Sequence, residues 1–360
     1  MFKRQEARGE RQEKTYISML EFDKGIIDRL EADGTSIPDD TLIGERELTK
    51  GEWEDFAPSF SPDGKSLTFS SNRSGNWDIW SMEFNGENLR QLTGEKADDI
   101  APVFSPDGKE IAYLRSKRQE ARGKKEEAAF ENLQLSIVNS QYDIWVMKSN
   151  GNGARQVTEG IPVLSYPAWH PDGKEIAFVS KGENGHEILT SGVQEPFGVR
   201  KPFGVRKIAF AFESGSKLPH SKDYPFKEFL YRIGYNPTGD KITFESNRSG
   251  NIEIWTMRSD GTDLICITKG DSPHWNPVWS PDGKRIAYTT QKLGDKAGHH
   301  NWRNYNIWVA DTETQKEMLI TGEEQADWNP VWSPDGKKIV YVTNRSGDLK
   351  HFSLWMLYLK

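Results

Sequence analysis

Four ionisable side chains recur at one position of a repeated motif, six residues before the residue that precedes a turn proline. They are Asp55, Asp99, His274 and Asp327. Carboxylates and an imidazole gathered around one axis would repel one another or compete for protons unless a cation or a basic group lay among them. Such a set could hold a divalent metal ion, or the Lys or Arg side chain of a bound segment. The alternative is a polar, hydrated axis that binds nothing.

Two tryptophans extend this set. Trp275 and Trp328 occupy one repeat position and could form a stacking platform at the rim of a channel. The aligned positions carry Phe56, Ile100 and Tyr231, so a repeated core position is the alternative. The predicted binding residues at the channel mouth are therefore Asp55, Asp99, His274, Trp275, Asp327 and Trp328.

Other catalytic or metal-binding motifs are not evident. His299 and His300 beside Asp295 lack a further spaced ligand, and His186-Glu187 lacks the second histidine of a zinc-protease helix. The sequence contains no nucleophile elbow, P-loop or dinucleotide fingerprint. We therefore expect no catalytic residue and no resident cofactor, and the four ionisable residues above are the only candidate ligands for a divalent cation.

A sixfold repeat would position these residues. A turn of the form aromatic-Ser-Pro-Asp-Gly-Lys, degenerate in the third and fourth copies, recurs at 60–65, 104–109, 169–174, 235–240, 279–284 and 332–337. In this turn Pro presets φ, Asp bonds the downstream backbone, and Gly takes a positive φ without a cost of roughly 1–2 kcal/mol. In five copies a strand ending in Thr precedes the turn at constant spacing.

Each unit reads as four short strands, and undecorated copies lie 44 residues apart. This length is typical of a four-stranded propeller blade. Strand 45–49 carries the Thr marker, whereas the last unit stops after its third strand. Pairing the two would close the ring and remove open sheet edges. We expect the tryptophans of the third strands to pack between blades, namely Trp80, Trp145, Trp255, Trp308 and Trp355.

Two domains follow from the repeat. Residues 1–43 form a charged extension or cap, in which Tyr16–Phe22 suggests a helix or an extra strand, and residues 44–360 form the propeller. The long loops 116–141 and 291–305 both join second to third strands and fall on the face of the predicted site, so we expect function there. The blades are predicted to begin near 56, 100, 165, 231, 275 and 328.

Composition excludes several classes of protein. The 360 residues carry a formal charge of −7, which disfavours binding to a phosphate backbone. Apolar runs such as Ile208–Phe212 are too short to span a bilayer, and the charged start shows no secretory signal. The single Cys266 permits no internal disulfide.

The pattern from Ala57 to Thr93 combines the turn, a Ser-Asn-Arg-Ser-Gly segment, Asp-Ile-Trp and Arg-Gln-Leu-Thr. It resembles the repeat of TolB-like six-bladed β-propellers, and the resemblance covers about 45–360. It implies an all-β fold of six four-stranded antiparallel blades closed by an N-terminal strand. The family's namesake is a periplasmic protein of the bacterial envelope with an α/β domain ahead of its propeller. Only 44 residues precede the closing strand, so we expect that domain to be absent.

The resemblance and the residues together suggest a non-catalytic binding or scaffold propeller. We expect a monomer, in the periplasm or outside the cell, that engages a protein or peptide at the channel mouth. We expect it to bind neither nucleic acid nor the membrane interior. One alternative is a propeller enzyme, a carbohydrate lyase or hydrolase, with a metal ion in the channel. Another is the accessory propeller of a prolyl-oligopeptidase-type peptidase.

Overall fold

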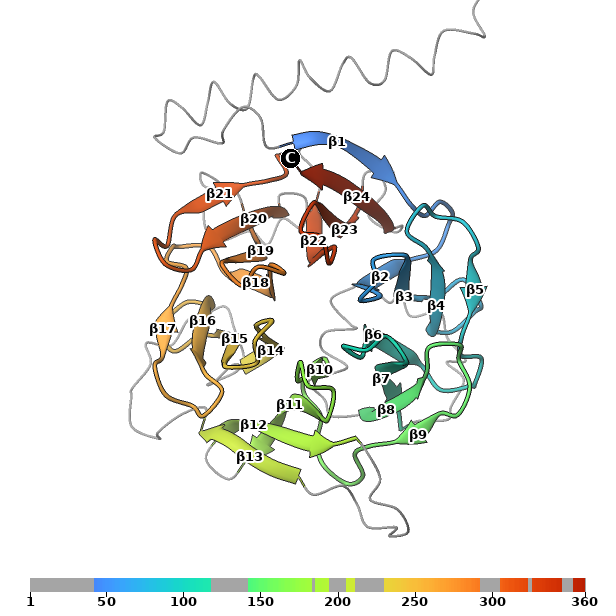
Figure 1. Cartoon of the computed structure of the whole chain (residues 1–360), viewed down its shortest axis with the longest axis horizontal. Helices are drawn as coiled ribbons and strands as arrows, with labels where there is room; N and C mark the ends of the chain where they lie inside the picture. Colours follow the sequence, from blue (N-terminus) through green and yellow to red (C-terminus); the bar gives the residue numbers. More distant parts are fainter. Residues whose placement is uncertain are drawn as a thin grey trace, which may run out of the picture.

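The chain folds into six four-stranded antiparallel sheets that surround a central axis (Figure 1). In this computed structural model the residues that can be described are 42–117, 142–182, 185–193, 205–210, 230–291, 305–322, 326–344 and 352–359. The prediction of an all-β, six-bladed propeller is therefore confirmed. No helix among the described residues is long and apolar enough to cross a membrane.

The first five blades each use four successive strands, from the axis outwards. Blade 1 consists of β2 (Asp55–Phe60), β3 (Ser66–Ser71), β4 (Asp78–Glu83) and β5 (Arg90–Gln91). Blade 2 consists of β6 (Asp99–Phe104), β7 (Glu110–Ser116), β8 (Tyr142–Lys148) and β9 (Arg155–Gln156). Blade 3 consists of β10 (Ala168–Trp169), β11 (Glu175–Gly182), β12 (Gly185–Gly192) and β13 (Val205–Phe210). Blade 4 consists of β14 (Leu230–Tyr235), β15 (Lys241–Ser246), β16 (Glu253–Arg258) and β17 (Ile265–Cys266). Blade 5 consists of β18 (His274–Trp279), β19 (Arg285–Gln291), β20 (Tyr305–Asp311) and β21 (Glu317–Leu319).

The sixth blade is shared between the two ends of the chain. Its inner strands are β22 (Asp327–Trp332), β23 (Lys338–Thr343) and β24 (Ser353–Leu359), and its outer strand is β1 (Leu42–Glu47). β1 pairs with β24 in antiparallel register, with Glu45 opposite Leu357. Tyr341 also donates a hydrogen bond to Glu45 Oε1 at 3.1 Å. Closure by an N-terminal strand is thereby confirmed.

In five of the six blades a repeated Thr follows the outer strand, and its hydroxyl completes the backbone ladder. In blade 1, Thr93 Oγ1 accepts the amide N–H of Ile79 at 2.9 Å. Across the closure, Thr49 Oγ1 accepts the amide of Leu354 at the same distance. Equivalent bonds occur at Thr158, Thr268 and Thr321.

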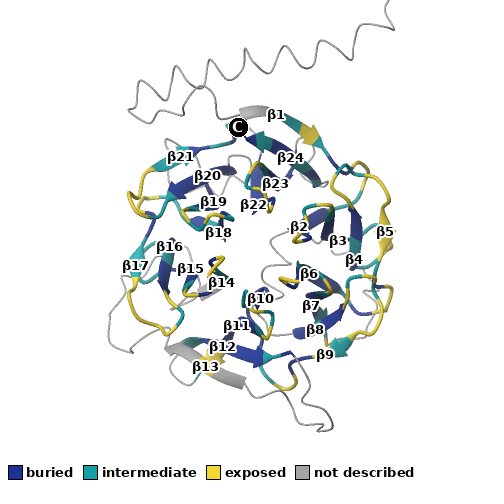
Figure 2. Ribbon diagram, in the orientation of Figure 1, coloured by how far each residue is buried: buried dark blue, intermediate teal, exposed yellow. Residues whose placement is uncertain are grey.

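The blades pack through a buried aromatic at the fourth position of each second strand's pattern. Strand interiors are buried and the connecting turns are exposed (Figure 2). The aromatic is at most 1% exposed in every blade, which explains why only large residues stand there. The six residues are Phe69, Tyr113, Phe178, Phe244, Tyr288 and Tyr341.

The Pro-Asp-Gly turns form a second ring of contacts. Ser61 Oγ donates to Asp63 Oδ1 at 2.6 Å and accepts the Ser66 amide at 2.9 Å. Gly64 adopts φ +70°, and a Cβ there would lie 3.6 Å from Pro334 of the sixth blade's turn. Each turn glycine thus faces the proline of the preceding blade.

Several predictions fall on residues outside the described ranges. They concern the extension before residue 42, including Tyr16–Phe22, and most of the loops 116–141 and 291–305. The described blades begin near the predicted positions, although the innermost strand of blade 3 begins at Ala168.

Candidate functional site

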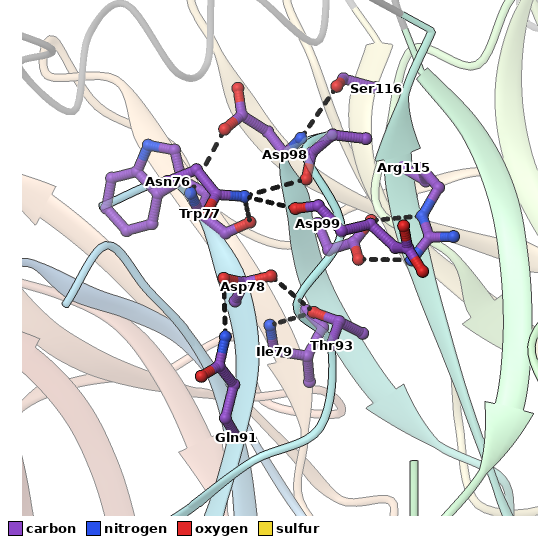
Figure 3. Close-up of polar contacts among 12 residues, drawn as sticks. Asn76, Trp77, Asp78, Ile79, Gln91, Thr93, Asp98, Asp99, Arg115 and Ser116 are labelled. Atoms are coloured by element: carbon purple, nitrogen blue, oxygen red, sulfur yellow. Dashed lines mark hydrogen bonds and ion pairs between the residues drawn. The ribbon is translucent and has the colours of Figure 1, made fainter. Parts of the chain in front are cut away.

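Two of the predicted acids begin the innermost strands of blades 1 and 2 and are fully buried. Arg73 Nη2 lies 2.7 and 2.8 Å from the two oxygens of Asp55. Arg115 binds Asp99 with Nε on one oxygen and Nη2 on the other, both at 2.7 Å (Figure 3). Each carboxylate is therefore neutralised by an arginine of its own blade.

The two arginines come from different elements of their blades, although each pairs with the aspartate at the same repeat position. Arg73 comes from the turn after β3, and its guanidinium lies 4.8 Å from the ring centre of Trp53 and 5.0 Å from that of Trp80. Arg115 comes from β7, directly opposite Asp99 in the strand register, and lies 4.8 Å from the ring centre of Trp145. Two of the tryptophans predicted to pack between blades therefore also cover an arginine.

Burial governs the ionisation of these acids. It raises the pKa of Asp99 to about 6, although the hydrogen bonds and the charge of Arg115 oppose it. Burial also raises the pKa of Asp55, against the charge of Arg73. The bidentate geometry at Asp99 indicates a formed ion pair at neutral pH.

In blade 5 the residue at this repeat position is a base, and its partner is an acid. His274 begins β18, is 4% exposed, and its Nδ1 lies 2.8 Å from Glu253 Oε2 in the neighbouring blade 4. Glu253 also accepts hydrogen bonds from the Thr268 hydroxyl at 2.6 Å and the Gly270 amide at 3.0 Å. The histidine thus ties two blades together instead of facing an open axis.

The remaining predicted residues differ in exposure. Asp327, the first residue of β22, is fully buried, and Trp328 is buried with its ring centre 5.0 Å from that of Phe352. Trp275 is partly exposed and packs against the largest core cluster. The six predicted residues therefore lie at the same end of the propeller, where innermost strands begin, and Trp275 is the one among them that is only partly buried.

A polar cluster that the sequence pattern did not predict lies at the axis. Arg232 Nη1 donates to Asn276 Oδ1 at 2.9 Å and to Asn329 Oδ1 at 2.7 Å, and its guanidinium lies 5.0 Å from the ring centre of Tyr166. A blade 4 side chain that reaches blade 6 must cross the axial region, because β14, β18 and β22 are innermost strands (Figure 1). These side chains share one repeat position, which we call the axial ring: Ala57, Ala101, Tyr166, Arg232, Asn276 and Asn329.

Backbone geometry sets the axial ring apart. Ala57, Ala101, Asn276 and Asn329 all have φ between 49° and 56°, and each lies within a shift of the strand register. The signal in the sequence was the proline that follows this position in most blades. Behind the ring, Glu245 is fully buried and its Oε1 accepts the amide N–H of Asn276.

A metal ion needs several donor side chains gathered at one place. Within the described ranges, no group of three or more His, Cys, Asp or Glu side chains is arranged to hold a metal ion. Asp55, Asp99 and His274 each face an internal partner of opposite or complementary charge.

The six sheets, closed by the pairing of β1 with β24, define a six-bladed β-propeller. A model of the TolB beta propeller domain matches residues 44–124. Over this stretch the chain is similar to TolB propellers, and as a whole it folds as a six-bladed β-propeller.

Curated relatives are similar to parts of the chain. The "Uncharacterized protein Atu1656" of Agrobacterium fabrum is 24% identical over 55% of this chain and 61% of its own length. A "Protein TolB homolog" of Chlorobium luteolum is 28% identical over 32% of this chain and 34% of its own length. The matches therefore span less than two thirds of these relatives.

Solved structures show the fold. The putative TolB from Agrobacterium tumefaciens superposes with a TM-score of 0.56 at 20% identity, over 89% of this chain and 99% of that one. An oligogalacturonate lyase in complex with manganese superposes with a TM-score of 0.52 at 13% identity, over 88% and 93% of the two chains. At these identities the likeness extends to the fold alone.

Proposed function

We propose that this chain is a non-catalytic binding propeller that engages a protein or peptide at the channel mouth, the end where the innermost strands begin. One observation carries the proposal: Asp55 and Asp99, two carboxylates that could act as acid, base or metal ligand, are paired inside their blades with Arg73 and Arg115. The axial ring instead offers amide and guanidinium groups, which form hydrogen bonds without exchanging protons near neutral pH.

The channel mouth offers aromatic surface as well. Trp275 is partly exposed beside the axial residue Asn276. A large amphipathic ring next to fixed hydrogen-bonding groups is typical of binding hot spots. We propose that Trp275 anchors the partner, and that Asp55, Asp99, His274, Asp327 and Trp328 hold the rim in shape through their contacts within and between the blades.

The names of the relatives are compatible with this proposal. One curated relative is named "Tol-Pal system protein TolB", which places that protein in a multicomponent system. We propose by this relationship that the present chain works as a monomer in the periplasm or outside the cell, without a resident cofactor.

A selection of displayed random peptides against the purified chain tests the proposal. We expect enriched peptides whose affinity, measured by fluorescence polarisation, falls roughly tenfold or more in Trp275→Ala. Phe84→Ala is the matched control, since Phe84 is an exposed aromatic in the turn after β4, at the other end of the blade. Peptide binding that survives Trp275→Ala would show that the channel mouth is not the site.

A metal titration separates binding from the enzyme alternative. We expect Mn²⁺, Ca²⁺ and Zn²⁺ to leave the melting temperature unchanged relative to chelator controls. A saturable rise that disappears in Asp99→Asn would contradict the proposal and favour a metal-dependent propeller enzyme.

A further inference from the structure

A cavity of about 460 Å³ lies between the third and fourth blades. The first turn of blade 3 and the turn between β16 and β17 both line it, so it lies at the end of the propeller opposite to the channel mouth. Its volume is in the range of small-molecule sites. The residues that matter here are His170, Asp172, Glu175, Lys207, Tyr235 and Asp260.

His170 makes this turn different from its counterparts. Four other blades have Ser at its position, and that Ser folds back onto its turn, as Ser61 does. The larger ring of His170 reaches towards blade 4, where its centre lies 4.9 Å from that of Tyr235 in edge-to-face geometry. A Cβ added at Gly239 of the blade 4 turn would lie 2.8 Å from His170 Nε2. The two rings therefore form an aromatic wall across the border between blades.

The charged walls come from both blades. Asp172 belongs to the blade 3 turn and Asp260 to the turn after β16 in blade 4, and both are exposed at the cavity. Lys207 is paired with Glu187, which does not line the cavity. Because Lys207 is paired in this way, the exposed carboxylates of Asp172 and Asp260 give the cavity wall a negative charge.

Local hydrogen bonds keep the two aspartates ionised. Those from the Thr262 hydroxyl and amide hold the pKa of Asp260 below its usual value. Burial pulls the pKa of Asp172 upward, but the Lys174 amide and His170 outweigh it and the pKa is lowered. Both carboxylates are therefore negative throughout the neutral range.

We propose that this cavity binds an organic cation, with an ammonium or guanidinium group between Asp172 and Asp260 and its carbon chain against Tyr235 and His170. Charged hydrogen bonds to carboxylates and contact with aromatic rings are the interactions that such groups prefer. A bare metal ion fits less well, because the lining acids belong to no metal-holding group among the described residues. The cavity shares no residue with the channel mouth, so this proposal can be tested independently of the proposed function.

Calorimetric titration of the full chain tests this site with two probes. Agmatine represents a free small molecule, and an acetylated, amidated Gly-Arg-Gly peptide represents the side chain of a polypeptide. We expect saturable binding of at least one probe, weakened by added salt. Tighter binding of agmatine identifies a small-molecule ligand, and tighter binding of the capped peptide identifies a basic segment of a polypeptide.

Three variants make the test specific. Asp172→Asn combined with Asp260→Asn is expected to reduce affinity roughly tenfold or more. His170→Ser restores the residue of four other blades, so it is expected to fold while weakening binding by removing half of the aromatic wall. Asp107→Asn is the control, because Asp107 accepts the equivalent backbone hydrogen bond in the blade 2 turn, from the Lys109 amide, and lies outside the cavity. Failure of both probes to saturate, or unchanged affinity in the Asp172/Asp260 double variant, would overturn the proposal.

Discussion

Arg73 and Arg115 each neutralise a buried aspartate, but they stand at different positions in their blades. A buried aspartate at the start of an innermost strand needs a cation, because an unpaired buried charge is costly. Blade 1 recruits the cation from the turn after β3, and blade 2 recruits it from β7. The aspartates were visible in the repeat, but their partners depend on strand register and turn direction. The sequence pattern therefore suggested a bound cation or a basic segment of a partner beside these acids, whereas Asp55 and Asp99 are paired with arginines of their own blades.

Glu245 gives a pH-dependent prediction at the residue scale. Burial raises its pKa to about 8, although the amide of Asn276 opposes the shift. Because the pKa in the folded state exceeds that in the unfolded state, the contribution of Glu245 to stability is most favourable below about pH 4.5 and is lost as the pH rises through about 8. Glu245→Gln keeps an acceptor for the Asn276 amide and removes the titration.

We therefore expect the melting temperature of Glu245→Gln, relative to the original chain, to increase steadily between pH 5 and pH 8. Differential scanning calorimetry at closely spaced pH values measures this difference. Glu83→Gln, an exposed carboxylate at the end of β4, is the control and should show no such trend. A flat difference for Glu245→Gln would mean that this carboxyl is ionised in the folded protein at neutral pH.

At the scale of elements, the Pro-Asp-Gly turns allow a matched comparison. Gly173 and Gly239 have φ of +72° and +78°, so alanine costs each turn roughly 1–2 kcal/mol of backbone strain. At Gly239 the new Cβ would also meet His170 Nε2 at 2.8 Å, whereas at Gly173 the nearest atom is 3.9 Å away. We expect Gly239→Ala to lower the free energy of unfolding by about 1 kcal/mol more than Gly173→Ala.

Urea unfolding of both variants measures that difference. His170→Ser should reduce the excess cost of Gly239→Ala, since it removes the ring that the new Cβ meets. Equal losses for the two glycines, with no rescue, would show that the blade 4 turn can move away from His170.

The sequence predicted these elements unevenly, for physical reasons. The six turns and the Thr markers were predictable because each depends on a short repeated motif, in which the hydroxyl of Thr93, for example, accepts the Ile79 amide. The closing strand was predictable because residues 45–49 carry the same Thr marker and the last unit lacks a fourth strand. The axial ring was not, because alanine rarely takes a positive φ on its own. Ala101 adopts φ 55° where its amide bonds the hydroxyl of Ser70 in the neighbouring blade. Only the assembled ring of blades supplies that partner.

Closure is the property of the whole molecule that can be tested most directly. Deleting residues 1–49 removes β1 and Thr49, and so exposes the outer edge of β24. The lost ladder contains several backbone hydrogen bonds of about 1 kcal/mol each, so we expect a loss of roughly 4 kcal/mol or more and concentration-dependent association.

Light scattering and urea unfolding report the two effects. Deleting residues 1–41 is the control, because it leaves β1 in place. A monomeric, fully stable chain without residues 1–49 would mean that β1 contributes little to closure.

The Thr hydroxyl bonds at the ends of the outer strands also indicate the order in which the blades form during synthesis. Within blade 1, Thr93 and Ile79 are 14 residues apart, whereas Thr49 and Leu354 are 305 apart. The longer loop adds about 3 kcal/mol of closure entropy to an otherwise identical bond, so the sixth blade should form last. At ribosomal rates, roughly 15–60 s pass between the synthesis of β1 and the synthesis of its partner strand β24. Glu45, Arg46 and Glu47 give this waiting strand charges that discourage pairing with another nascent chain.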